Sequence, residues 1–250
     1  MTTDMKIDAT NGVQTIRFAR PEKKNALVGP MYQAMVDALL AGEREPSIAV
    51  HVFMGTPGAF TAGNDIGDFM TRAMSGKPVL EGPGLDFIRL LPRIEKPMIA
   101  AVDGLAIGIG TTLLMHCDLV YASPTAWLQT PFLDLGLVPE AGSSLLAPRL
   151  MGHQRAFELL VLGEPFTADR AYEVGLVNAV VPSETLEETA LAAARRLAAK
   201  PREALIASRR LLRGETAALS SAIETEARLF AERLASNEAR SAFATFLGRK

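Results

Sequence analysis

The stretch AAVDGLAIGIGTTLLMHCDLVYA, residues 100–122, runs from a predicted buried strand through three glycines into an apolar helix and then into a second strand. Gly104, Gly108 and Gly110 stand where the first strand ends, so the free N–H groups of the helix's first turn face whatever lies beyond that strand. The spacing G-x-x-x-G-x-G differs from the dinucleotide fingerprint G-x-G-x-x-G. It is therefore a weak signal for a dinucleotide, and close packing of a buried helix through small residues is the structural alternative.

Upstream of this stretch, strands and helices alternate. Asn11-Gly12 separates two roughly alternating runs within residues 5–18 and predicts a type I′ hairpin. Residues 29–46 place apolar side chains on one helical face, and 48–54 reads as a buried strand. The polar segment 71–83 contains Gly and Pro, and it predicts a mobile loop.

Downstream, the pattern shifts towards helices. Two helices are predicted between residues 154 and 175, followed by a short extended segment at 176–181. From Ser183 to the end nearly every residue has helical character, with breaks near Pro201 and Gly214. Strands and helices in alternation, followed by helices alone, predict an α/β core with a helical carboxyl-terminal part.

The composition is that of an ordinary globular chain, with 48% hydrophobic and 22% charged residues over 250 residues. Because Lys and Arg number 26 against 28 Asp and Glu, no global field favours nucleic acid or an anionic membrane. A lone cysteine, Cys117, argues against disulfides and thiolate metal sites. The amino terminus lacks a signal-peptide core, and no apolar run is long enough to span a membrane, so we expect a cytoplasmic protein.

A second glycine-rich stretch, GTPGAFTAGNDIGDF at 55–69, directly follows a predicted strand. Glycines there allow backbone N–H groups to approach a ligand oxygen. A tight turn in which Asn64 and Asp65 bond their own backbone is the alternative. The phosphate-loop pattern is absent, and the three histidines show no metal-ligand spacing, so no metal site is predicted.

Glu140 is an acidic residue in an otherwise apolar and small-residue stretch, LGLVPEAGSSL at 135–145. A carboxylate near the start of a helix is favoured by the helix dipole and is usually solvated. The other interpretation is a reagent in a chemical reaction. From the residues alone, the solvated charge at a helix start is the favoured interpretation.

Five stretches resemble, in order, the signature regions of one family. They are RPEKKNAL (20–27), GAFTAGNDI (58–66), DGLAIGIGTTLLMHCDLVYAS (103–123), TPFLDLGLVPEAGSSLLAPRLMG (130–152) and GEPFTADRAYEVGLVNAVVP (163–182). The family is that of the enoyl-CoA hydratases and isomerases, the crotonase superfamily. The resemblance covers nearly the whole chain, from about Met5 to the final helices.

The resemblance implies an α/β fold of the ClpP/crotonase-like class, a spiral of repeated ββα units with two roughly perpendicular sheets. It divides the chain into a spiral core at 1–195 and a helical trimerisation region at 196–250. The amphipathic segment 211–236 is suited to packing on a partner. We therefore expect a homotrimer, or a hexamer built as a dimer of trimers.

The resemblance also implies stabilisation of an enolate formed at the thioester carbonyl of an acyl-CoA. By motif position, the two backbone N–H donors fall on Ala62 and Ile109. Thr112 and Phe132 occupy the two positions at which a hydratase carries its catalytic glutamates, which disfavours hydration. Glu140 then resembles the single catalytic glutamate of the Δ3,Δ2-enoyl-CoA isomerase branch, in which one base moves a proton from C2 to C4.

Substrate binding is implied for further residues of the same motifs, with Lys24 near a phosphate of coenzyme A. They are Lys24, Ala26, Leu27, Thr61, Gly63, Asn64, Asp65, Ile66, Gly108, Gly110, Phe132 and Pro139. Asp65 is also expected to order its loop by bonding backbone N–H groups. No cofactor is implied other than the coenzyme A of the substrate.

Two alternatives to the isomerase remain at this stage. One is another crotonase-type activity, such as enoyl-CoA hydration or an acyl-CoA lyase or hydrolase reaction. The other is a non-catalytic module that binds acyl-CoA and keeps the fold. The two glycine-rich loops favour catalysis, because a scaffold has no need of two aimed N–H donors.

Overall fold

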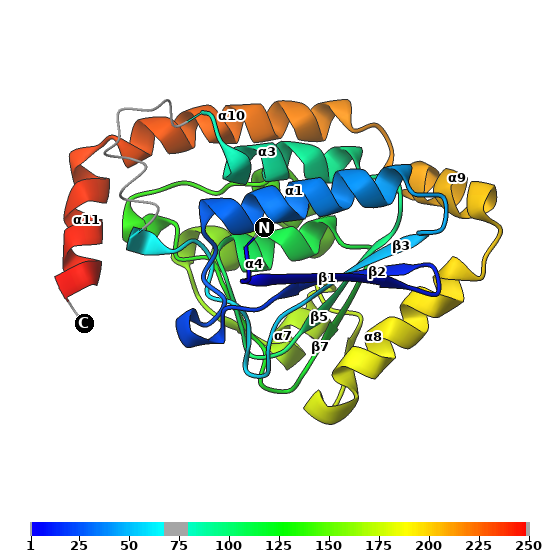
Figure 1. Ribbon diagram of the computed structural model, residues 1–250. Helices are drawn as coiled ribbons and strands as arrows, with labels where there is room; N and C mark the ends of the chain where they lie inside the picture. The colour runs from blue at the N-terminus through cyan, green and yellow to red at the C-terminus, as the bar shows by residue number, and fades with distance from the viewer. Residues whose placement is uncertain (1, 68–79, 249–250) are drawn as a thin grey trace.

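The computed structural model describes residues 2–67 and 80–248, which form two β-sheets surrounded by helices (Figure 1). The larger sheet has the strand order β1 (Met5–Thr10), β2 (Val13–Phe18), β3 (Val50–Met54), β5 (Met98–Val102), β7 (Leu119–Ala122) and β10 (Ala179–Val180). The smaller sheet has the order β4 (Ala59–Thr61), β6 (Leu105–Ile107), β8 (Trp127–Gln129) and β9 (Phe166–Thr167).

The predicted amino-terminal hairpin is confirmed. β1 and β2 pair antiparallel, with Thr10 opposite Val13. Asn11 and Gly12 have φ angles of 53° and 80°, and a type I′ turn requires positive values at both positions. Beyond the hairpin, β2, β3, β5, β7 and β10 all pair parallel to their neighbours.

The chain winds as a spiral and adds one strand to each sheet on every turn. β3 is followed by β4, β5 by β6 and β7 by β8, and the second member of each pair joins the smaller sheet. The β4, β6 and β8 strands pair parallel and are three residues long. This repeat confirms the predicted α/β spiral.

The predicted helices are present in the expected order, and a further helix at 83–90 lies where none was predicted. The helices are α1 (Gly29–Arg44), α3 (Pro83–Leu90), α4 (Ile109–Thr112), α5 (Ser143–Met151), α6 (His153–Phe157), α7 (Ala168–Glu173), α8 (Ser183–Ala198), α9 (Arg202–Arg213), α10 (Ala217–Leu234) and α11 (Asn237–Gly248). The helix breaks predicted near Pro201 and Gly214 are confirmed, and a further helix break lies between α10 and α11.

The predicted domain boundary at 195/196 falls inside α8 and stays a prediction. Most of the loop predicted at 71–83 lies outside the described residues, and its last residue begins α3.

Side chains along β3 alternate between the two faces of the larger sheet, and each face contributes to a separate hydrophobic cluster. Val50 and Val52 pack against α8 on one face of the larger sheet, whereas Phe53 points to the other face, where α1 and α3 lie. Figure 1 shows α8 on the side of the sheet opposite α1 and α3, with α10 running across α3. This arrangement brings α10, from the end of the chain, over the loops that follow the strands.

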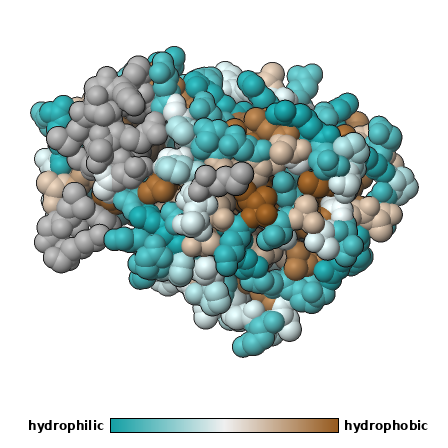
Figure 2. All heavy atoms as spheres, viewed as in Figure 1, coloured by the Kyte–Doolittle hydropathy of each residue, from teal (hydrophilic) through white to brown (hydrophobic). Residues whose placement is uncertain are grey.

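The molecular surface is largely polar on the face drawn in Figure 2, where hydrophobic residues appear as scattered spots. Among the helices in the described part of the chain, none is both long enough and apolar enough to cross a membrane.

Candidate active site

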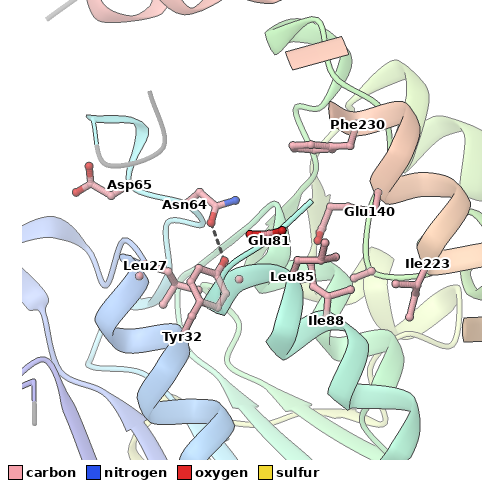
Figure 3. Close-up of a pocket in the computed structure, with 14 residues that line it drawn as sticks. Leu27, Tyr32, Asn64, Asp65, Glu81, Leu85, Ile88, Glu140, Ile223 and Phe230 are labelled. Atoms are coloured by element: carbon pink, nitrogen blue, oxygen red, sulfur yellow. Dashed lines mark hydrogen bonds between the residues drawn. The ribbon is translucent and has the colours of Figure 1, made fainter. Parts of the chain in front are cut away.

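A pocket with two lobes lies where the strand ends, α3 and α10 meet. Asn64, Glu140 and Phe230 line both lobes. One lobe is walled by α1, α3 and α10, and Figure 3 shows Tyr32 and Glu140 on its opposite sides. The other lobe extends from the loops at 62–66 and 107–109 past Phe132 to α11. Glu140 therefore stands at the junction of the two lobes.

Two loops that are distant in the sequence are hydrogen-bonded like parallel strands. The Leu27 N–H donates to the Gly63 carbonyl at 2.7 Å, and the Asp65 N–H donates to the Leu27 carbonyl at 2.9 Å. The buried Asn25 side chain donates to the carbonyl of Ala59 at 2.7 Å. The loop at 24–27 therefore holds the segment 61–65 in a fixed orientation.

This pairing decides which N–H group is free to bind a ligand. The Ala62 N–H donates to the Lys24 carbonyl at 2.9 Å, and the Gly63 N–H donates to Thr61 Oγ1 at 3.1 Å. Within residues 2–67 and 80–248, the N–H of Asn64 has no hydrogen-bond partner, because the bridge to Leu27 turns it away from the 24–27 loop. The role expected of the Ala62 N–H thus needs correction, since the donor left free is that of Asn64.

The Ile109 N–H is also available, as the motif predicts. Gly108 has φ 57° and ψ −118°, a conformation suited to glycine, and it turns the chain into α4. Ile109 is the first residue of α4, so its N–H has no acceptor within the helix. A Cβ on Gly63 would lie 2.6 Å from the Ile107 carbonyl oxygen, which shows how closely the two loops touch. Asn64 and Ile109 consequently line the same lobe.

Glu140 is a buried acid, with 9% of its surface exposed. Thr112 Oγ1 donates a hydrogen bond of 2.6 Å to Glu140 Oε1. Burial raises the pKa of Glu140 to about 8; the Thr112 hydrogen bond opposes this rise, and the negative charge of Glu226 adds to it. The carboxyl group of Glu140 therefore has a pKa near neutral pH. One of its oxygens is held by Thr112, the residue at one of the two positions where a hydratase glutamate is expected.

The loop after Glu140 is fixed from two sides. Ala141 has the unusual φ of 59°, and its carbonyl accepts a 2.6 Å hydrogen bond from His116 Nε2. Burial lowers the pKa of His116 to about 4, so the ring is neutral and its Nε2 carries the proton. The buried Glu226 of α10 accepts the Gly142 N–H at 2.6 Å. This role of Glu226 has no local signal in the sequence, because Gly142 and Glu226 are 84 positions apart.

Most of the predicted site residues meet at this pocket. Those that line it are Leu27, Ala62, Gly63, Asn64, Asp65, Ile66, Gly108, Ile109, Phe132 and Glu140. The others are not among its lining residues and keep their roles as predictions: Lys24, Ala26, Thr61, Gly110 and Pro139. Asp65 orders its loop as expected, by accepting the Gly67 N–H at 3.0 Å. It also accepts a hydrogen bond from Arg20.

Within residues 2–67 and 80–248, no three His, Cys, Asp or Glu side chains are grouped so that they could hold a metal ion.

Tyr32 was not singled out from the sequence. Its hydroxyl donates to Asn64 Oδ1 at 2.6 Å, the interaction drawn as a dashed line in Figure 3. The only local signal for it was its place in the first turns of a predicted helix.

Comparison with known proteins agrees with this architecture. The sequence model described as enoyl-CoA hydratase/isomerase matches residues 8–250. Enoyl-CoA delta isomerase 2 of Rattus norvegicus is 34% identical over 98% of this chain, which spans 63% of the length of that relative. The 4-chlorobenzoyl coenzyme A dehalogenase-1 of an Arthrobacter species is 33% identical, over 92% of this chain and 89% of its own. Among solved structures, OdaA of Pseudomonas aeruginosa is 40% identical with a TM-score of 0.93, covering 98% of this chain and 99% of its own.

Proposed function

Because this chain belongs to the enoyl-CoA hydratase/isomerase family, we propose that it moves the double bond of a 3-enoyl-CoA to the conjugated position of a trans-2-enoyl-CoA. One observation carries the proposal: among the described residues that line the pocket, Glu140 alone supplies a buried carboxyl group, and it shares one lobe with the N–H groups of Asn64 and Ile109. That set of groups suits a reaction in which one base moves a proton along the substrate.

The Asn64 and Ile109 N–H groups bind the thioester oxygen, with Asn64 taking the role that the motif assigns to Ala62. When a proton leaves C2, negative charge builds up on that oxygen, and two fixed donors stabilise it. Removal of one such donor typically costs about 3–4 kcal/mol of transition-state stabilisation. Both donors belong to the main chain, so the apolar side chain of Ile109 is no obstacle.

Glu140 acts as both base and acid. Its carboxylate removes a proton from C2, the electrons pass into the dienolate, and the protonated carboxyl returns a proton at C4. The hydrogen bond from Thr112 holds Oε1 and leaves Oε2 for this exchange. The raised pKa of Glu140 makes its carboxylate a stronger base than a solvated glutamate.

Hydration is disfavoured by the side chains around Glu140. The two positions of the hydratase glutamates carry Thr112, which is already engaged with Glu140, and Phe132, which is buried and apolar. The other acids that line the described pocket are Asp65, Glu81 and Asp134. Asp65 is paired with Arg20, and the other two are exposed. An isomerase and a dehalogenase are similar to this chain at nearly the same sequence identity. The stronger support for the isomerase is therefore that Glu140 is the one buried acid among the described residues that line the pocket.

Coenzyme A is assigned to the edge formed by the 24–27 loop. Lys24 is exposed there, directly before the segment that pairs with residues 61–65, and its ammonium group suits a phosphate. Ala26 and Leu27 follow it along the path to the pocket. Replacement of Lys24 with Met tests this assignment: the KM for acyl-CoA rises while kcat stays close to that of the wild type.

We expect the chain to assemble as a homotrimer or a dimer of trimers. Leu211 and Leu212 of α9 are 84% and 89% exposed in the single chain, an unusual cost for adjacent leucines unless a partner covers them. Light scattering coupled to size-exclusion chromatography measures the mass directly. Replacement of both leucines with Ser should then lower the assembly state.

The activity is tested by incubating the protein with 3-hexenoyl-CoA and recording the absorbance of the conjugated thioester together with the product mass. The proposal requires a conjugated product of unchanged mass, formed by the wild type and lost in Glu140→Gln. A product heavier by one water would identify a hydratase. Binding without any turnover would identify a non-catalytic acyl-CoA-binding module.

A further inference from the structure

The position of the Asn64 N–H depends on two anchors of different kinds. The first is the main-chain bridge, in which Leu27 bonds to Gly63 and to Asp65 and leaves the intervening residue facing away. The bridge fixes the residues on either side of Asn64 and supplies no bond to Asn64 itself. Gly63, directly before it, has φ 79°, a left-handed backbone conformation that favours glycine.

The second anchor is a side-chain hydrogen bond from outside the loop. Tyr32 Oη donates to Asn64 Oδ1 at 2.6 Å, a short distance for a bond between neutral groups. Figure 3 shows Tyr32 reaching from α1 to Asn64 on the side of the pocket opposite Glu140. Since Asn64 has only two side-chain torsions, fixing its Oδ1 also restricts its Cα and the peptide N–H attached to it.

Tyr32 is itself held rigidly. Tyr32 is only 5% exposed and lies on α1, one turn after the helix begins. The ring packs against Phe87 of α3 with a centroid separation of 5.8 Å, and Phe87 packs in turn against Phe53 of the larger sheet at 6.4 Å. The hydroxyl therefore connects Asn64 to the core of the molecule.

We infer that Tyr32 is a positioning residue, whose hydroxyl fixes through the Asn64 carboxamide the N–H donor that binds the thioester oxygen. The inference rests on the proposed function, because it assigns that donor to Asn64. A displacement of the N–H donor by a fraction of an ångström weakens mainly its hydrogen bond in the transition state, because the thioester oxygen carries the most charge there. Tyr32 thus acts on turnover more than on binding of the substrate.

Three variants test the inference: Tyr32→Phe, Asn64→Ala and the double variant. In Tyr32→Phe, kcat for 3-hexenoyl-CoA falls about tenfold while KM stays within about twofold, as expected when only transition-state stabilisation is lost. The pH midpoint of turnover stays unchanged, because Glu140 is intact. Adding Tyr32→Phe to Asn64→Ala produces no further loss, because both remove the same hydrogen bond. Tyr172→Phe on α7 is the matched control, since Tyr172 is exposed and lies outside the pocket.

A spectroscopic measurement separates positioning from a general effect on the fold. The infrared carbonyl band of bound trans-2-hexenoyl-CoA, labelled with ¹³C at the thioester, moves to lower frequency as its oxygen is hydrogen-bonded. In Tyr32→Phe this displacement becomes smaller, and in Tyr172→Phe it equals that of the wild type. Should Tyr32→Phe fail to fold, Asn64→Ala carries the test, because it removes the acceptor and leaves the aromatic cluster untouched.

Two results overturn the inference: an unchanged carbonyl band and kcat in Tyr32→Phe, or effects of the two substitutions that multiply in the double variant. A wild type that neither turns over 3-hexenoyl-CoA nor displaces the carbonyl band overturns the proposed function instead. The two failures are therefore distinguishable.

Discussion

Replacing Glu140 with Gln removes the proton-accepting group and keeps the size and shape of the side chain. The amide oxygen can still accept the hydrogen bond from Thr112, so the loop should keep its conformation. A general base typically contributes about 10²–10⁴-fold to a rate. We therefore expect kcat for 3-hexenoyl-CoA to fall by about a thousandfold, while the KM changes little.

The same substitution should stabilise the fold. The pKa of Glu140 rises from 4.5 to about 8 on folding, mainly because burial disfavours the charged form. Between these values the unfolded chain binds fewer protons than the folded one, so stability falls as pH rises through this window. At pH 7 the difference corresponds to about 3 kcal/mol, which the uncharged amide avoids.

Urea unfolding at pH 7 measures this gain, and the absorbance of the conjugated thioester measures the loss of activity. Glu224→Gln is the matched control, because Glu224 lies on the surface of α10, paired with Arg89 and outside the pocket. That control should retain wild-type turnover, with its stability changed by less than about 1 kcal/mol. A Glu140→Gln protein that turns over within tenfold of the wild type, or that is less stable, would refute the reasoning.

Three further predictions concern the groups around Glu140. In the wild type, kcat/KM should rise with pH, with a midpoint near the Glu140 pKa of about 8. Thr112→Val should move this midpoint up by about one pH unit in a pH–rate profile, because it removes a hydrogen bond that lowers the pKa of Glu140. Glu226→Gln should move the midpoint down, because it removes a negative charge that raises the pKa of Glu140. An unchanged midpoint would exclude this electrostatic coupling between Glu226 and Glu140. Gly63→Ala should cost about 1–3 kcal/mol of stability in thermal melts and most of the activity, because φ is 79° and the new Cβ would lie 2.6 Å from the Ile107 carbonyl oxygen. A fully active, stable Gly63→Ala protein would contradict the close approach of the two loops.

The elements that could be predicted from the sequence are those whose signal is local. The Asn11-Gly12 turn requires positive φ at both residues, and few other pairs meet that requirement so well. β3 and β5, the two central strands of the larger sheet, are short and largely apolar runs that are buried on both faces. By contrast, β4, β6 and β8 have three residues each, too few for a recognisable period, so the smaller sheet was foreseen only through the resemblance.

The site shows the same division between local and distant causes. Motifs marked the two loops and Glu140, but they did not show which N–H of residues 62–65 is free. That depends on hydrogen bonds with a loop nearly forty residues earlier, which use the N–H of Ala62 and leave that of Asn64. Likewise, Tyr32 and Glu226 reach the site from α1 and α10, and only the folded chain brings them there.

The central claim is that one carboxyl group carries out both proton steps. Its most direct test uses 3-hexenoyl-CoA labelled with deuterium at C2, incubated with the wild type in ordinary water, with the label located in the product by NMR. Because Glu140 is buried, the deuteron that it accepts should exchange slowly with solvent, so part of the trans-2-hexenoyl-CoA should carry deuterium at C4. A product with no deuterium at C4, or one to which water has been added, would contradict the account.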